Sequence, residues 1–169
     1  MALVVEDGSI VSGANSYVDL TDARAYAAAR GVTLSSTDAD VEVLAIGAMD
    51  YLEQLDYAGS IVDADQPLLW PRTGVYIRGY LFDYSSIPQR LVDAQCQLMM
   101  AQHNSVSLYA NLSADGGGFV TREKVGPIET EYATPADGGY LSAYATLPQV
   151  DALLKPLLAH SGGFAVGRA

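Results

Sequence analysis

Apolar side chains recur at every third or fourth position in two stretches of the chain, which is the spacing of one face of an α-helix. The pattern predicts helices over 38–55 and 88–104. Two shorter stretches, 19–30 and 147–159, show the same spacing and predict two further helices. The apolar stripe of 38–55 consists of Val41, Leu44, Ala45, Ala48, Leu52 and Leu55.

Residues that start and stop helices support these boundaries. Asp19 suits the N-cap of the first helix, because its carboxylate can accept a hydrogen bond from a free N–H of the first turn, and Gly31 follows its last residue. Pro88 stands near the first position of the third helix, where a missing N–H is harmless. The four helices therefore have recognisable ends.

Glycine, proline and aromatic residues mark long connections between the helices. Residues 56–87 form one connection, and a loop of that length is uncommon without a function of its own. Residues 119–132 alternate in polarity and break at Gly126 and Pro127, which predicts a β-hairpin or one long bent strand. We therefore predict a mainly α fold, a small bundle of about four helices with a strand arm and flexible termini.

A single domain is expected, because a chain of 169 residues can bury one hydrophobic core. Its expected parts are an N-terminal arm (1–17), a helical core (18–110), a flexible loop with the β arm (111–140), a C-terminal helix (147–159) and a tail (160–169).

Acidic residues outnumber basic residues by 20 to 9, which gives a net charge of −11. Such a chain is repelled by the phosphate backbone of nucleic acids unless its basic residues gather on one face. They are scattered along the sequence, so charge does not favour general nucleic-acid binding. Cys96 is the single cysteine, which excludes an intrachain disulfide and a cysteine-based zinc site. We expect neither a signal peptide nor a membrane-spanning segment.

One cluster in the long connection combines aromatic and basic side chains, and it supports two interpretations. Its members are Trp70, Arg72, Tyr76, Arg78 and Tyr80. In the first interpretation these residues stack on bases of single-stranded DNA and contact its phosphates. In the second, which we favour, the pair Trp70 and Pro71 anchors the connection against the helices, because apolar residues precede it.

Other candidate sites are weaker. Residues 31–71 contain eight acidic side chains and no Lys or Arg, and a metal site is conceivable at Asp63 and Asp65. A solvated acidic face is the interpretation we favour for this segment. His103 and His160 lack a nucleophile and a carboxylate at a recognisable spacing. We therefore expect no enzymatic activity, no cofactor and no bound metal.

Several segments resemble one small phage-encoded family. They are Ala14–Val18, Asp22–Tyr26, Asp50–Leu52, Leu69–Gly74, Ile87–Gln89, Asp93–Cys96, Glu123–Ile128 and Leu153–Leu158. Their order and spacing resemble the family often labelled DnaT-like single-stranded-DNA-binding protein, whose relatives include head–tail connector proteins of long-tailed phages. The most specific segment contains Leu-Trp-Pro-Arg-Thr-Gly.

The resemblance to connectors implies a structural virion protein in the neck of a tailed phage, assembled in the host cytoplasm. Such a subunit would form a ring with copies of itself, commonly a dodecamer. The ring would bind the portal protein and a stopper, head-completion or tail terminator protein, and double-stranded DNA would pass through its channel during packaging and ejection.

Within this hypothesis, alternating charges mark a candidate subunit interface, because opposite charges can fix the register of paired strands. The interface residues are Arg122, Glu123, Lys124, Val125, Gly126, Pro127 and Ile128, and the residues of a portal-docking tail are Phe164, Val166 and Arg168. The alternative hypothesis is a DnaT-like single-stranded-DNA-binding protein. Salt dependence separates them: the connector predicts no DNA affinity at physiological salt, and the DNA-binding protein predicts affinity with a steep salt slope.

Overall fold

The computed structural model describes residues 2–109, 122–125, 128–131 and 147–159. The chain divides into two compact units, one made of Met1–Val106 with Thr146–Ala169, and one of Ser107–Ala145. We call the first the helical unit.

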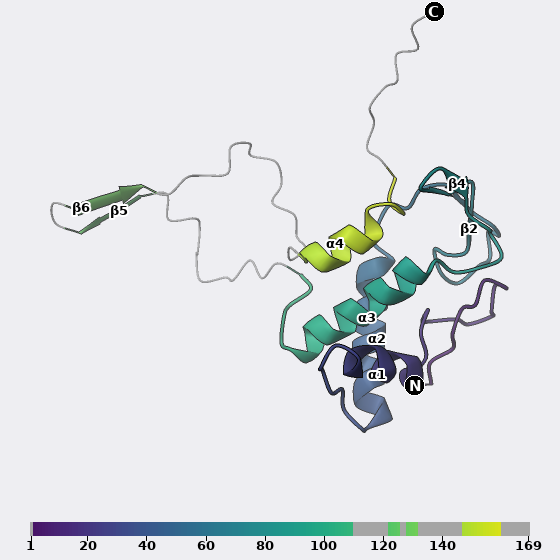
Figure 1. Ribbon diagram of the computed structural model, residues 1–169, viewed down its shortest axis with the longest axis horizontal. Coiled ribbons are helices and arrows are strands. Elements are labelled where there is room, and N and C mark those ends of the chain that lie inside the picture. The colour runs from purple at the N-terminus through teal and green to yellow at the C-terminus, as the bar shows by residue number, and fades with distance from the viewer. Residues whose placement is uncertain (1, 110–121, 126–127, 132–146, 160–169) are drawn as a thin grey trace, which may run out of the picture. The chain divides into compact units, whose positions relative to one another are not determined.

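Four α-helices make up the helical unit within the described ranges (Figure 1). They are α1 (Leu20–Ala28), α2 (Asp38–Leu52), α3 (Gln89–His103) and α4 (Pro148–Leu154). The Asp19 side chain accepts a hydrogen bond from the N–H of Asp22 at 2.7 Å and so caps α1. The predicted mainly α fold with four helices and a small β-hairpin arm is confirmed.

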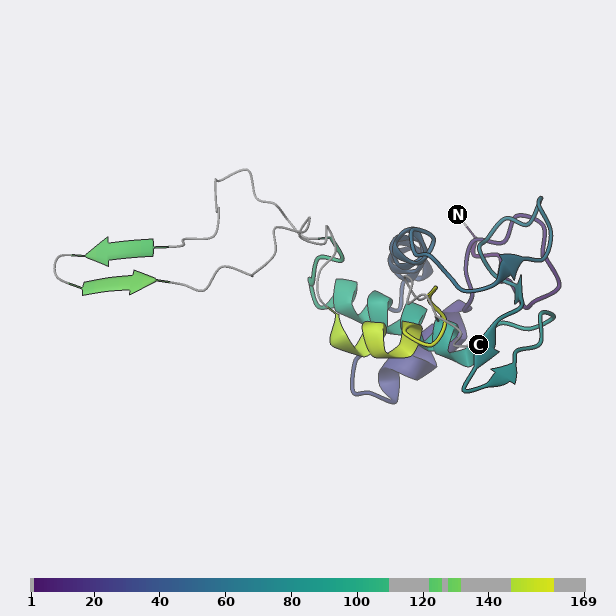
Figure 2. The ribbon, with the colours of Figure 1, turned by 90° about the horizontal axis from the view of Figure 1, so that it is seen from above.

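The core lies where α2 and α3 pack together, and α4 lies along α3 in both ribbon views (Figures 1 and 2). Gly47 leaves room for the end of the Gln102 side chain, because a Cβ at this position would overlap its carboxamide. That carboxamide donates to the carbonyl of Leu44 at 2.9 Å. The fully buried apolar residues here include Val41, Ala45, Ala48, Leu52, Leu91, Ala94, Leu98 and Met99.

The long connection between α2 and α3 contains two small antiparallel sheets. One pairs β1 (Ser60–Ile61) with β2 (Arg72–Thr73), and the other pairs β3 (Tyr76–Ile77) with β4 (Tyr80–Leu81). Only two residues separate β3 from β4, so this pair is a tight hairpin. The connection is therefore a structured lobe beside the helices (Figure 1).

The N-terminal arm is held by a buried carboxylate. Glu6 is 1% exposed and accepts hydrogen bonds from the N–H groups of Gly8, Ile10 and Val11 at 2.8–3.0 Å. Gly8 has a φ of +106°, and a Cβ there would overlap the backbone of Ser85. The arm thus packs closely against the end of the lobe.

The second unit contains one hairpin among its described residues. Strand β5 (Arg122–Val125) pairs antiparallel with β6 (Ile128–Glu131), in a register that pairs residue Arg122 with residue Glu131. This hairpin is the β arm expected from the alternating sequence.

Candidate nucleic-acid interface

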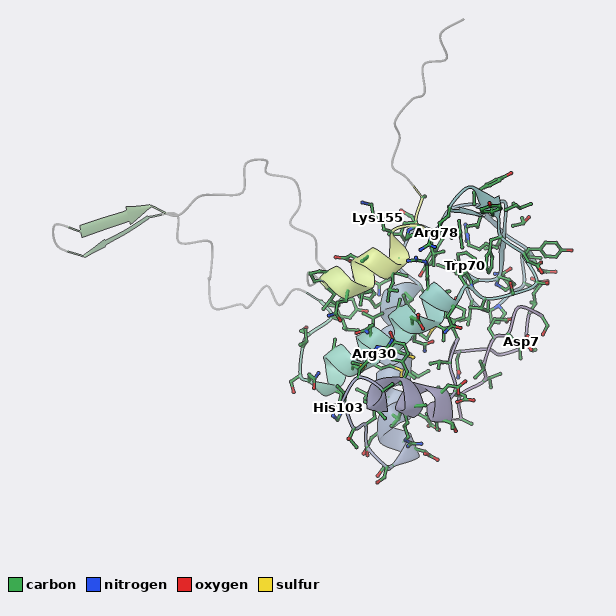
Figure 3. The ribbon with its side chains drawn as sticks, viewed as in Figure 1. Asp7, Arg30, Trp70, Arg78, His103 and Lys155 are labelled. Carbon is green, nitrogen blue, oxygen red and sulfur yellow. The ribbon has the colours of Figure 1, made fainter. Side chains whose placement is uncertain are left out.

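Trp70 lies inside the lobe and has no exposed surface (Figure 3). Its ring meets the ring of Tyr57 edge to face, with centroids 5.8 Å apart, and that of Phe82 in the same way at 6.2 Å. The Trp70–Pro71 peptide bond is cis. Because these neighbours enclose the indole, it offers no face on which a base could stack.

A short hydrogen-bonded network ties this part of the lobe to the end of α2. The Tyr17 hydroxyl donates to Oε1 of Glu53 at 2.8 Å and accepts from the N–H of Trp70 at 3.2 Å. Oε2 of Glu53 accepts from the N–H of Leu69 at 2.9 Å. Burial raises the pKa of Glu53 above its ordinary value, since the charged carboxylate loses solvation. The network therefore fixes the backbone at Trp70, and it does so with a carboxylate whose charged form is poorly solvated.

Arg72 is engaged entirely with the backbone of the lobe. Its guanidinium donates to the carbonyls of Tyr57, Ala58, Gly59 and Leu69 at 2.8–3.2 Å. Burial lowers its pKa from the ordinary value. A guanidinium has five N–H donors, so these four bonds leave little capacity for a phosphate. Arg72 therefore joins the first residues of the lobe to its middle part.

The other three residues of the sequence cluster are presented to solvent by the β3–β4 hairpin. The side chains of Tyr76 and Tyr80 are 64% and 81% exposed. Arg78 and Gly79 form the two-residue turn with φ values of +53° and +84°, as a type I′ turn requires. Arg78 is exposed and has no hydrogen bond or ion pair within the described part of the chain. We call Tyr76, Arg78 and Tyr80 the hairpin triad.

The register of the hairpin places its two tyrosines on opposite faces. Tyr76 pairs with Leu81, which is 63% exposed, and Tyr80 pairs with Ile77. Cross-strand partners share a face and successive residues alternate. Each face of the ribbon therefore carries one exposed phenol beside an aliphatic side chain, and Arg78 stands at the tip between them.

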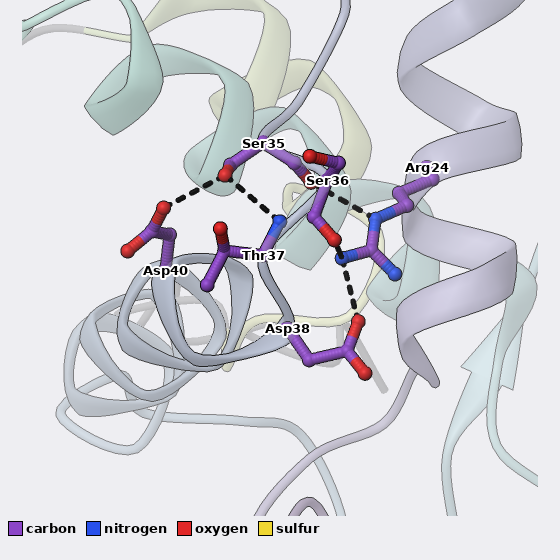
Figure 4. Close-up of polar contacts among 6 residues, drawn as sticks. All are labelled: Arg24, Ser35, Ser36, Thr37, Asp38 and Asp40. Atoms are coloured by element: carbon purple, nitrogen blue, oxygen red, sulfur yellow. Dashed lines mark hydrogen bonds and ion pairs between the residues drawn. The ribbon is translucent and has the colours of Figure 1, made fainter.

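Arg24 forms an ion pair and hydrogen bonds within the helical unit (Figure 4). Its guanidinium lies 2.7 Å from Oδ1 of Asp38 and donates to the carbonyls of Ser35 and Ser36. These contacts fasten α1 to the segment that leads into α2. Arg24 is thus not free to bind a phosphate.

The acidic pair suggested as a metal site forms a local turn. Oδ1 of Asp63 accepts from the N–H of Asp65 at 2.8 Å. Among the residues that the structure describes, no three His, Cys, Asp or Glu side chains gather as metal ligands. Likewise, no helix in the described ranges has the length and apolar character needed to cross a membrane.

The candidate subunit interface is described only in part. Its strand residues 122–125 and Ile128 belong to the β5–β6 hairpin. Gly126 and Pro127 lie outside the described residues, as do the tail residues Phe164, Val166 and Arg168.

The chain matches one protein-family model over residues 1–169, and the family is described as "Putative DnaT-like ssDNA binding protein". The chain belongs to this family. Searches of curated proteins and of solved structures found no match. The resemblance to the DnaT-like family is thereby confirmed, whereas the head–tail connector identity has no support.

The prediction of a structural virion protein is therefore wrong, because the family model that covers the whole chain carries a DnaT-like description and nothing supports a place in the phage neck. The hypothesis that we placed second agrees better with the family of the chain. Self-association and the absence of enzymatic activity stay predictions.

Sequence reasoning grouped five residues that the structure separates into two kinds. Trp70 and Arg72 are directed inward, and the hairpin triad is directed outward. One signal could have found the division: Arg78-Gly79 stands between the two-residue strands of β3 and β4, and a residue-glycine pair between apolar strands is typical of a type I′ hairpin.

Proposed function

We propose that this DnaT-like family member binds single-stranded DNA through the β3–β4 hairpin. The observation that carries the proposal is the exposure of Tyr76 and Tyr80, at 64% and 81%, on either side of Arg78, which has no partner among the described residues. Tyr is on average intermediate in burial, so exposure of this extent at two positions of one short hairpin leaves both rings available for stacking. The family description supplies the ligand class.

The chemistry of the hairpin suits unpaired bases. A phenol ring stacks on any base, because every base has a π face, and such stacking contributes about 1–3 kcal/mol per base. Bases in a duplex have their faces covered by neighbouring bases, so stacking on a protruding phenol favours single strands. The backbone of a strand that crosses the tip would pass Arg78, whose guanidinium can bind one phosphate.

The charge of the chain sets the expected salt dependence. Arg78 is the only cation among residues 76–81, and the net charge of −11 opposes long-range attraction of DNA. Each phosphate neutralised on a single strand contributes about −0.7 to the slope of log K against log salt. We therefore expect a shallow slope near this value, in place of the steep slope that a basic groove would give.

Fluorescence anisotropy with labelled oligothymidylate tests the proposal. The double variant Tyr76→Ala/Tyr80→Ala should weaken binding by roughly 5-fold or more for each base that loses its stacking partner. The matched variant Tyr76→Phe/Tyr80→Phe keeps both rings and should bind like wild type. A control on α2, Val43→Ala, alters a side chain that is 70% exposed and should have no effect.

Arg78→Asn isolates the contribution of the cation, because Asn-Gly is a favoured type I′ turn and keeps the hairpin. This variant should lower affinity at low salt and flatten the salt slope. Absence of oligothymidylate binding by wild type at low salt would contradict the proposal. An equal loss in the Phe and Ala double variants would contradict the stacking argument.

A further inference from the structure

A second feature of the helical unit is an open groove between α1, α3 and α4. It has a volume of about 660 Å³ and is lined by Tyr26, Arg30, Arg90, Asp93, Gln97, Met100, Gln149, Ala152 and Leu153. A neighbouring hollow of about 350 Å³ shares Gln97, Met100 and Gln149 with it. Small-molecule sites commonly have volumes of about 300–1,000 Å³. The groove is large enough to hold a nucleotide.

The end of α1 contributes a flat cationic surface to this groove. The guanidinium carbon of Arg30 lies 3.3 Å from the centroid of the Tyr26 ring, and Nη1 of Arg30 donates to the Tyr26 carbonyl at 3.0 Å. The Tyr26 hydroxyl in turn accepts from Nε2 of Gln97 at 3.1 Å. These contacts hold the guanidinium plane in place, and Arg30 remains exposed (Figure 3). Nucleobases stack on such guanidinium planes.

The α3 side of the groove contributes groups that recognise polar ligands. Arg90 is half-buried and has no hydrogen bond or ion pair within the described ranges. Asp93 accepts from Nε2 of Gln89 at 3.0 Å, and its second carboxylate oxygen has no partner among the described residues. A free guanidinium suits a phosphate. A carboxylate beside it suits an exocyclic amino, imino or hydroxyl donor.

Apolar and amide side chains complete the site. Met100 and Leu153 are half-buried, and Gln149 is exposed at the start of α4. A site with only cations would bind any anion, and a site with only apolar groups would bind any hydrophobic molecule. The combination of a stacking plane, a free guanidinium, a carboxylate and an apolar floor matches a ligand with a flat heterocycle and one negative group.

We propose that the groove between α1, α3 and α4 binds one nucleotide, with the base stacked on Arg30 and the phosphate held by Arg90. The nucleotide is either free in solution or one unit of a single strand. In the second case the inference rests on the proposed function, since the strand that contacts the hairpin triad would also enter the groove. The groove and the hairpin share no residue, so each can be tested alone.

Nuclear magnetic resonance of the ¹⁵N-labelled full chain tests the inference with thymidine monophosphate, inorganic phosphate and oligothymidylate as probes. Thymidine monophosphate should shift the amide signals of Tyr26 and Gln97 saturably. Arg90→Gln should weaken this binding by roughly 10-fold or more, as loss of a charge-assisted hydrogen bond does. Arg30→Lys keeps the positive charge but removes the planar guanidinium, and it should weaken the binding of thymidine monophosphate by roughly 5-fold or more. Lys155→Gln removes an exposed cation at the C-cap of α4, outside the groove, and should leave this binding unchanged.

The outcomes separate the groove from the hairpin. No saturable shift with either nucleotide probe, or equal affinity for inorganic phosphate, overturns the inference. Shifts with thymidine monophosphate alone support a free nucleotide as the ligand, and shifts with oligothymidylate that Arg90→Gln weakens support a bound strand. The variant Tyr76→Ala/Tyr80→Ala should leave binding of thymidine monophosphate unchanged. If wild type binds thymidine monophosphate in the groove but the hairpin variant Tyr76→Ala/Tyr80→Ala binds oligothymidylate as tightly as wild type, only the proposed function is overturned.

Discussion

Replacing Trp70 by alanine separates its structural role from a role in DNA binding. The indole has no exposed surface and meets two aromatic rings edge to face. A buried aromatic side chain removes about 150–250 Å² from water, which at about 25 cal/mol per Å² corresponds to about 4–6 kcal/mol. Because some surrounding groups relax into the cavity, we expect Trp70→Ala to lower the free energy of unfolding by about 3–5 kcal/mol.

A phenylalanine at the same position supplies a second, sharper test. Nε1 of Trp70 is buried and has no hydrogen-bond partner among the described residues. An unpaired buried N–H costs about 1–3 kcal/mol, and Trp70→Phe removes it while keeping an aromatic ring. The gain offsets part of the lost packing, so this variant should be destabilised by at most about 2 kcal/mol.

Urea unfolding followed by far-ultraviolet circular dichroism measures both variants without relying on tryptophan fluorescence. Oligothymidylate affinity, measured where each variant is folded, provides the complementary result. The reasoning is refuted if Trp70→Ala unfolds at the wild-type urea concentration and yet loses DNA binding, because Trp70 would then contact the strand rather than hold the lobe.

Three further substitutions test the contacts that position the hairpin and the helices. Arg72→Lys removes the planar guanidinium that binds four carbonyls, and the ammonium that replaces it has only three donors. The free energy of unfolding, measured in urea, should therefore fall by about 1–3 kcal/mol. An unchanged urea midpoint would show that Arg72 does not stabilise the lobe. Glu53 has a raised pKa in the folded chain, so it contributes stability that is fully present below its unfolded pKa and lost as pH rises through the folded pKa. The stability of Glu53→Gln relative to wild type should therefore increase as the pH rises from about 4.5 to 7. The measurement is the urea midpoint of the variant minus that of wild type, taken at both pH values. If this difference between the two proteins is the same at both pH values, the prediction is refuted. Gly47→Ala places a methyl group against the carboxamide of Gln102, which can move away but would then lose its hydrogen bond to the carbonyl of Leu44. That loss of about 0.5–1.5 kcal/mol is offset by about 1 kcal/mol from the higher helix propensity of alanine, so the free energy of unfolding should change by less than about 1 kcal/mol. A loss above about 3 kcal/mol in urea unfolding would show that the Gln102 side chain cannot move away.

The apolar spacing determined the helices, because local periodicity and end residues decide where a helix can bury one face. In the predicted helix 88–104, Gln95 falls on the same face as the apolar residues Leu91, Ala94 and Leu98, and spacing alone gives no reason for a polar residue there. In the structure Gln95 is fully buried, accepts from the N–H of Tyr17 at 2.9 Å and donates to the hydroxyl of Ser16. A polar residue in an apolar stripe thus holds the N-terminal arm through a contact remote in sequence.

The division of the aromatic-basic cluster was decided only by the tertiary structure. Trp70 and Tyr76 are close in sequence and similar in type, yet one is buried and the other is 64% exposed. The difference arises because Tyr57 and Phe82, which are not sequence neighbours of Trp70, pack their rings against its indole, whereas the β3–β4 turn directs Tyr76 away from the core. The sequence of a segment shows which of its side chains have rings that can stack on a base. Only contacts between distant segments decide which of them are covered, since burial depends on what packs against a residue rather than on its neighbours in sequence.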